Sequence, residues 1–241
     1  MRRAAIRRWV VRGAAVVLVT ALGVLAWSLT SDNFGIVRAG QVYRSGQMSA
    51  GAIERTVRAR GIKTVVNLRG AHPEKMEYRD ERAAVLGAGA TQVDLAMSSC
   101  EWMSRAQAKT LVDVIDTFER PMLIHCWHGA ERTGLASAFS ELLRPGGSLT
   151  SARAQFSLRY LFVPIKDGAV MPAHLDQYEA WLRHRRLGHA PAHFRRWVAD
   201  GFRPGRPSRE QWPYDPYPLI VITRPGPESV RMANEASRLR K

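Results

Sequence analysis

A cysteine and an arginine, separated by five residues, are the two side chains of this chain best suited to chemistry. They lie in the string His125-Cys126-Trp127-His128-Gly129-Ala130-Glu131-Arg132-Thr133-Gly134. A free thiol has a pKa of about 8.5 and is mostly protonated at neutral pH, but a nearby arginine and a helix N-terminus both favour its ionised form. The arginine fork also binds two oxygens of a phosphate group. Cys126 and Arg132 therefore predict a site that binds a phosphate group and attacks it.

The residues on either side of this string indicate the elements that hold it. Residues 122–124 are apolar and predict a strand, and residues 135–143 predict a helix. The first N–H groups of a helix have no partner inside the helix and bind anions well. Gly129 permits a tight curl that aims successive N–H groups at one point. Thr133 stands where its hydroxyl could hydrogen-bond the Cys126 sulfur.

This string resembles the signature of the cysteine-dependent protein tyrosine phosphatases, which is His-Cys, five residues, Arg, then Thr or Ser, then Gly. The likeness is closest to the dual-specificity branch and its bacterial members, and it covers residues 38–160. Tyr43-Arg44-Ser45-Gly46-Gln47 resembles the opening segment of the bacterial members, and residues 62–70 resemble their second strand and the loop after it. The resemblance implies an α/β fold, with a mostly parallel central sheet flanked by helices, and no metal or organic cofactor.

The same resemblance implies roles for the residues of the string. Cys126 would attack phosphorus, and Arg132 with the backbone N–H groups would hold the phosphate oxygens. The substrate would be bound by the remaining positions of the loop, which are Trp127, His128, Gly129, Ala130, Glu131 and Thr133. None of these six is a lysine or arginine, and Glu131 would repel a second phosphate.

The general acid is expected on a loop about thirty residues before the cysteine, as the family resemblance implies. Asp94 stands at that distance, but residues 91–97 alternate like a strand. Residues 98–102 form the expected loop, and Glu101 is its only carboxylate. We favour Asp94 over Glu101 as the acid, and a structural role for both is the alternative.

Composition limits the classes of protein to which this chain can belong. Its 241 residues are 46% apolar, enough for one domain with a sizeable core. The net charge of +15 favours anionic partners. Zinc-ligand spacing, a basic-region helix and a basic-aromatic ladder are all missing from the sequence, so nucleic acid is not an expected partner. The two cysteines are too few for a disulfide scaffold, although Cys100 could form a resting disulfide with Cys126.

The N-terminal segment predicts a membrane anchor. Five arginines in the first 12 residues precede an uncharged run of 18 residues, 13–30, near the lower limit for crossing a bilayer. We expect residues 10–30 to contact the membrane as an uncleaved single-pass anchor, with a cleaved signal peptide as the alternative. The positive-inside rule places the catalytic domain on the non-cytoplasmic, periplasmic side.

The rest of the chain predicts alternating elements around the site. Helices are expected over residues 49–60, 73–86, 104–118, 150–158, 172–186 and 191–199, and a short edge strand over 219–223. Four histidines of the C-terminal half are expected at the surface, namely His174, His184, His189 and His193. We divide the chain into an anchor or signal segment (1–30), a catalytic domain (31–160), a helical and proline-rich extension packed on it (161–225) and a mobile tail (226–241).

Together these features predict a phosphatase that hydrolyses phosphate monoesters through a cysteinyl phosphate, with phosphotyrosine or dual-specificity protein substrates or a small phosphate ester. The first alternative is a phospholipid or inositol phosphate as substrate, which the membrane anchor favours. The second alternative is a non-catalytic phosphate-binding module. That module would require the loss of the cysteine or the arginine, and both are present.

Overall fold

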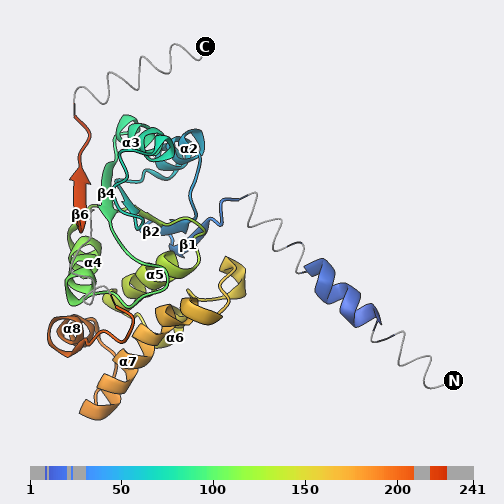
Figure 1. Ribbon diagram of the computed structural model, residues 1–241, viewed down its shortest axis with the longest axis vertical. Helices are drawn as coiled ribbons and strands as arrows, with labels where there is room; N and C mark the ends of the chain where they lie inside the picture. The colour runs from blue at the N-terminus through green and yellow to red at the C-terminus, as the bar shows by residue number, and fades with distance from the viewer. Residues whose placement is uncertain (1–8, 10, 21–22, 24–30, 209–217, 227–241) are drawn as a thin grey trace.

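The computed structural model describes residues 9, 11–20, 23, 31–208 and 218–226. Within them, six strands form one sheet: β1 (Gly35–Arg38), β2 (Val42–Ser45), β3 (Thr64–Asn67), β4 (Thr91–Leu95), β5 (Met122–His125) and β6 (Ile220–Thr223). Their order is β1-β2-β5-β3-β4-β6 (Figure 1). The four inner strands are parallel, and β1 and β6 are antiparallel at the edges. The α/β expectation is confirmed, with a mixed sheet.

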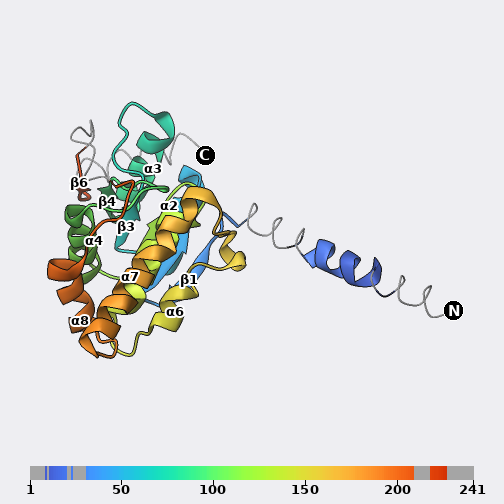
Figure 2. The ribbon, with the colours of Figure 1, turned by 60° about the horizontal axis from the view of Figure 1, so that its bottom comes forward.

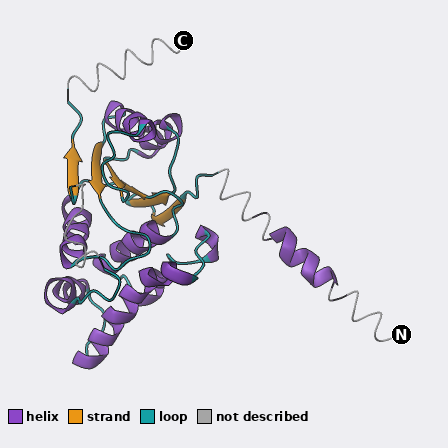
Figure 3. Ribbon diagram, in the orientation of Figure 1, coloured by secondary structure: helices purple, strands orange, loops and turns teal. Residues whose placement is uncertain are grey.

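Helices cover both faces of the sheet, as the colouring of Figure 3 shows. One face carries α2 (Ala50–Arg60) and α3 (Met76–Gly87). The other carries α4 (Arg105–Thr117), α5 (Glu131–Leu143), α6 (Leu149–Arg153), α7 (Val170–Arg185) and α8 (Pro191–Arg196). Short helical turns follow at η1 (Leu158–Tyr160), η2 (Lys166–Ala169) and η3 (Trp197–Gly201). In the turned view of Figure 2, α7 runs across the front of the domain.

Capping residues set the ends of the helices that flank the site. The hydroxyl of Ser49 accepts a hydrogen bond from the N–H of Ala52 and begins α2, as expected. Ser104 and Gln107 form a capping box that begins α4. By contrast, α3 begins at Met76 rather than at Pro73, because residues 73 and 74 form a turn. The helix expected over residues 150–158 ends at Arg153, and α7 begins at Val170, before Pro172, which a first helical turn tolerates.

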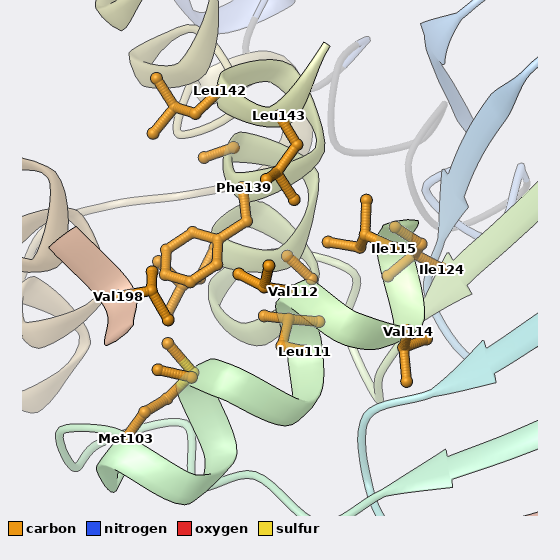
Figure 4. Close-up of a cluster of buried hydrophobic side chains, with 14 of the residues drawn as sticks. Met103, Leu111, Val112, Val114, Ile115, Ile124, Phe139, Leu142, Leu143 and Val198 are labelled. Carbon is orange, nitrogen blue, oxygen red and sulfur yellow. The ribbon is translucent and has the colours of Figure 1, made fainter. Parts of the chain in front are cut away.

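The larger apolar cluster lies between the sheet and the helices α4, α5, α7 and α8. Figure 4 shows part of it, including Leu111, Val112 and Ile115 of α4, Phe139 of α5 and Ile124 of β5. Burial of each such side chain contributes about 1.5–3 kcal/mol. The cluster fixes α5 against β5 and so determines where the loop between them lies.

Of the predicted membrane segment, residues 10–30, the structure describes residues 11–20 and 23. Within it, residues 11–20 form a helix with exposed side chains. Among the residues that the structure describes, no helix has the length and apolar character needed to cross a bilayer. The N-terminal transmembrane helix is therefore unsupported by the structure.

The C-terminal part of the chain returns to the sheet. Residues 220–223 form β6, which pairs with β4, and the predicted edge strand is confirmed. The carbonyl of Pro207 accepts a hydrogen bond from the N–H of Trp102, and Ser208 forms a bridge with the same residue. The proline-rich stretch at 209–217 and the predicted tail after residue 226 lie outside the described residues.

Candidate active site

The loop between β5 and α5, residues 126–130, forms a curled cradle. Gly129 has φ of 73°, a left-handed conformation that glycine adopts without strain. A Cβ at this position would lie 2.6 Å from the nitrogen of Gly46 and 2.8 Å from the carbonyl of Ser45. Both the backbone angle and the close approach of β2 therefore require glycine. The helix α5 begins directly after the curl, at Glu131, with its N-terminus next to the cradle.

The thiol of Cys126 lies at the base of the cradle and is 1% exposed. Its sulfur accepts a hydrogen bond from the N–H of Gly129 at 3.3 Å. Burial alone would raise the pKa of Cys126, but the charge of Arg132 and hydrogen bonds from Thr133 and Gly129 hold it below its ordinary value. The Thr133 hydroxyl also lies 3.4 Å from the carbonyl of Ser45, a long contact. The site thus favours the nucleophilic form of the thiol.

Arg132 links the cradle to the loop of residues 96–103. Its Nη1 donates to the carbonyl of Met97 at 3.3 Å. Its Nε is buried and has no hydrogen-bond partner among the described residues. A buried donor without an acceptor is costly, and a phosphate oxygen would supply the acceptor. Arg132 is therefore placed to hold an anion above the Cys126 sulfur.

His125, which precedes the nucleophile, forms a buried ion pair with Glu81 of α3. Its Nε2 lies 3.0 Å from Oε1 of Glu81, and both side chains are 1% exposed. Burial favours neutral His125, but the Glu81 charge outweighs it and raises the pKa of His125. Burial likewise favours neutral Glu81, yet His125 and the amide of Gln47 lower its pKa. His125 therefore holds its proton more strongly than a free imidazole does.

Two exposed side chains and one arginine form the outer surface of the cradle. Trp127 is 47% exposed and His128 is exposed, whereas Ala130 is buried and Glu131 is partly buried. The guanidinium of Arg69 lies 4.4 Å from the centroid of the Trp127 ring. Arg69 also donates to Oε1 of Gln47 at 2.7 Å. A second cation, absent from the loop sequence, thus lies beside the predicted phosphate site.

Asp94, the acid favoured from the sequence, lies in a closed polar cluster. Its Oδ1 accepts hydrogen bonds from Asn67 at 3.0 Å and Gln92 at 2.9 Å, and its Oδ2 accepts one from Tyr78 at 2.7 Å. The side chain is fully buried, and burial raises the pKa of Asp94 against the opposing effect of these three bonds. The structure therefore disfavours Asp94 as a proton donor, because both of its oxygens are occupied inside the domain.

Sheet register separates Asp94 from the nucleophile as well. Asp94 pairs with Asn67, and Asn67 pairs with His125. The backbones of Asp94 and His125 are therefore two strand spacings apart, about 10 Å. Paired positions share a face of the sheet, and here that face is covered by α3, since Tyr78 contacts Asp94 and Glu81 contacts His125.

Glu101, the other candidate acid, is on the loop that Arg132 contacts. This loop is held at its start by Gln107, whose Nε2 donates to the carbonyl of Ala96 at 2.6 Å. At its end, the N–H of Met103 donates to Nε2 of His174 at 3.3 Å. Cys100 is exposed on the same loop, and both it and Cys126 are free thiols. The loop is thus anchored at both ends, with Glu101 between the anchors.

His174 corrects one expectation from the sequence. It is fully buried rather than at the surface, and its ring packs on Trp102 with centroids 4.3 Å apart. Burial lowers the pKa of His174 to about 4, so that it is neutral near pH 7. A neutral ring can accept the N–H of Met103 while its Nδ1 contacts the carbonyl of Val170 at 2.9 Å.

Sequence reasoning missed Glu81 and Arg69 as parts of the site. Glu81 lies between Tyr78 and Val85 on the buried stripe of α3, and an acid on an apolar stripe is a signal that could have found it. Arg69 follows the carboxyl end of β3, where open α/β sheets bind ligands. The sequence gives the positions of both residues but not their contacts, because their partners come from other elements.

The chain is similar to several known proteins. Residues 27–143 match a family described as the tyrosine phosphatase family. The structure of TpbA from P. aeruginosa is 20% identical, with a TM-score of 0.50, and the match covers 71% of this chain and 93% of that one. The core catalytic domain of the PP-IP phosphatase SIW14 from S. cerevisiae, in complex with citrate, is 18% identical, with a TM-score of 0.47 and coverage of 64% and 92%. No curated protein matches the chain.

Proposed function

We propose that this chain is a cysteine-dependent phosphatase of the tyrosine and dual-specificity superfamily, and that its substrates are phosphotyrosine residues in proteins. One observation carries this proposal. A buried thiol, whose pKa is lowered by Arg132, lies under a cradle with an unpaired buried donor. That combination binds a phosphate dianion and presents a thiolate to its phosphorus atom.

The arrangement supports a two-step hydrolysis. The Cys126 thiolate attacks phosphorus, and the new S–P bond forms as the ester P–O bond breaks. Arg132 and the N–H groups of the cradle hold the equatorial oxygens, where charge develops. Water then attacks the cysteinyl phosphate, the S–P bond breaks, and inorganic phosphate leaves.

We propose Glu101 as the general acid that protonates the leaving oxygen. It is the carboxylate of the loop that Arg132 contacts through Met97, whereas the oxygens of Asp94 are held by three donors. Loss of a general acid costs about 10²–10⁴ in rate, and the cost shrinks when the leaving group needs no proton. Glu101→Gln should therefore steepen the dependence of kcat/KM on leaving-group pKa in a series of aryl phosphates. A steeper dependence in Asp94→Asn, with Glu101→Gln unchanged, would assign the role to Asp94.

The surroundings of the nucleophile favour an aryl phosphate. The Cys126 sulfur is buried, and the neighbouring Trp127 ring is 47% exposed. A phosphate on an aromatic ring can reach the buried sulfur while the ring contacts Trp127. The side chain of phosphoserine is shorter and has no ring to make that contact. Aromatic contacts of this kind contribute about 0.5–1.5 kcal/mol beyond burial.

A second candidate substrate carries two neighbouring phosphates, as inositol phosphates and phospholipid head groups do. Arg69 favours it, because it is a partly buried cation next to the cradle. Arg69 donates to the neutral amide of Gln47, and its ion pair with Glu77 is long, 3.9 Å, and half-exposed, so it offsets the charge of Arg69 only weakly. Arg69→Gln should lower kcat/KM for such a substrate much more than for a phosphotyrosine peptide.

A substrate panel on the full-length chain tests the proposal. Phosphotyrosine peptides, phosphoserine peptides, inositol polyphosphates and phosphoinositides should be compared at equal concentration. We expect the highest kcat/KM for phosphotyrosine peptides and no turnover by Cys126→Ser. Preference for a polyphosphate would overturn the substrate class, and substantial turnover by Cys126→Ser would overturn the covalent mechanism.

A further inference from the structure

Arg44 of β2 is a fully buried guanidinium directly behind the cradle. Its Nη2 donates to the carbonyl of Gly129 at 2.7 Å. Its Nη1 donates to the carbonyl of Gln155 at 2.8 Å and to Oε1 of the same residue at 3.0 Å. The guanidinium carbon lies 3.6 Å from the centroid of the Tyr160 ring. Arg44 therefore joins β2, the cradle and the segment after α6.

No carboxylate among the described residues forms an ion pair with Arg44. Its partners are two carbonyls, one amide and one aromatic ring. Burial lowers the pKa of Arg44 to about 10, while Tyr160 and Cys126 act in the opposite direction, so the group remains charged at neutral pH. A buried cation without a counter-ion is unfavourable. The Cys126 thiolate, or a phosphate dianion bound above it, supplies the missing negative charge.

The bond to Gly129 also sets the direction of a peptide group. In a trans peptide the C=O and the following N–H point in opposite directions. Because Arg44 holds the carbonyl of Gly129 on the outside of the cradle, the N–H of Ala130 points away from Arg44, into the cradle. The preceding N–H, that of Gly129, already donates to the Cys126 sulfur. Two successive N–H groups are thus directed at one anion.

We propose that Arg44 is a positioning residue of the phosphate site, which aims the N–H of Ala130 at the substrate oxygens and whose buried charge is neutralised by the Cys126 thiolate or the bound phosphate. This inference rests on the proposed phosphatase activity. It accounts for a guanidinium that reaches neither the solvent nor a carboxylate.

Other charged groups also act on the Cys126 thiol, so the effect of Arg44 must be separated from theirs. Arg132 of α5 faces the sulfur directly, and His125 of β5, paired with Glu81 of α3, precedes it. Arg69 contributes from the loop after β3. None of these four contacts Arg44, so substitution of Arg44 leaves them in place.

The test measures the ionisation of the thiol and the turnover rate in the same full-length variants. Cys100→Ser is introduced throughout, because exposed Cys100 would also react. The rate of alkylation by iodoacetamide against pH gives the midpoint for Cys126, and p-nitrophenyl phosphate gives kcat and KM. The variants are Arg44→Met, Arg44→Lys and the control Arg159→Met, since Arg159 lies over the same Tyr160 ring at 5.0 Å but is exposed.

We expect Arg44→Met to raise the alkylation midpoint by about one pH unit and to lower kcat by about 10². Arg44→Lys should keep the midpoint but lower kcat at least about tenfold, because an ammonium cannot span Gln155 and Gly129 at once. Arg159→Met should match the parent protein. If circular dichroism shows that Arg44→Met does not fold, the kcat of Arg44→Lys tests the proposal.

Three results would overturn the inference: a folded Arg44→Met with the parent midpoint, wild-type kcat in Arg44→Lys, or an equal effect of Arg159→Met. Failure of the proposed function is distinguishable. A parent protein that hydrolyses no phosphate ester would refute the activity, while the alkylation midpoint would still report whether the charge of Arg44 acts on the thiol.

Discussion

Replacing Glu81 by glutamine should destabilise the domain by about 2–3 kcal/mol near pH 6. The Glu81 and His125 side chains lie 3.0 Å apart and are each 1% exposed, so that solvent screens their attraction little. Removal of one partner of a buried pair costs about 3–5 kcal/mol when the remaining charge cannot be neutralised. His125 can lose its proton, and the cost is then nearer that of a lost hydrogen bond to a charged group, about 1.5–3 kcal/mol.

The pH dependence of this effect has a definite sign. The pKa of Glu81 is lowered from 4.5. Its contribution to the free energy of unfolding is therefore present above pH 4.5 and is lost as the pH falls through the pKa of Glu81 in the folded state. The pKa of His125 is raised from 6.5. Its contribution to the free energy of unfolding is therefore complete below pH 6.5 and is lost as the pH rises through the pKa of His125 in the folded state. The difference between wild type and Glu81→Gln should therefore be greatest between pH 4.5 and 6.5 and should decline at alkaline pH.

Urea denaturation at pH 5.5 and pH 9 measures this difference. Glu77→Gln is the matched control, because Glu77 is on the same helix, is 48% exposed and lies 3.9 Å from Arg69. The control should change the free energy of unfolding by no more than about 0.5 kcal/mol. An equal cost for the two variants, or a cost for Glu81→Gln that is the same at both pH values, would refute the buried ion pair.

Three further predictions concern the cradle and the N-terminus. Gly129→Ala should cost at least about 2 kcal/mol in the free energy of unfolding, since φ is 73° and the new Cβ would lie 2.6 Å from a backbone nitrogen; a variant with wild-type Tm and kcat would contradict this. Arg132→Lys should lower kcat by about 10² or more, because an ammonium cannot form the two-oxygen fork, and a near-normal rate on p-nitrophenyl phosphate would show that Arg132 is structural. The full-length protein should pellet with membranes and resist alkaline carbonate, while removal of residues 1–30 should release an active domain; protection of that domain from protease in intact spheroplasts would reverse the predicted orientation.

The cradle was predictable because its parts are contiguous in the chain. The apolar run 122–124 lies in β5, and Gly129 has the left-handed angle of the expected curl. The helix after the arginine is also present, although α5 begins at Glu131, four residues before the predicted start at residue 135. A strand, a tight turn and a helix N-terminus depend on local backbone preferences, which sequence patterns report well. The same holds for the N-caps Ser49 and Ser104, whose hydroxyls accept hydrogen bonds from N–H groups three residues further on.

The order of the strands could not be predicted in this way. The sheet places β5 between β2 and β3, so that Arg44 lies behind the cradle and Arg69 beside it. Nothing within residues 42–45 or 64–70 indicates that β5 lies between these two strands. Strand order depends instead on how crossover helices pack on the two faces of the sheet. Glu81, the partner of His125, and Tyr78, one of the three partners of Asp94, could not be predicted for the same reason, because both come from α3.

The sequence by itself determined the nucleophile, the phosphate-binding arginine and the strand–loop–helix that holds them, since these depend on chemistry within ten consecutive residues. Only the tertiary structure decided which charges surround the thiol and which side chains surround Asp94. Asp94 has the expected separation from Cys126 along the chain, but the sheet register turns it toward α3, where Tyr78, Asn67 and Gln92 occupy its oxygens. Separation along the chain does not specify a face of the sheet, whereas register does, because successive side chains of a strand point to opposite sides.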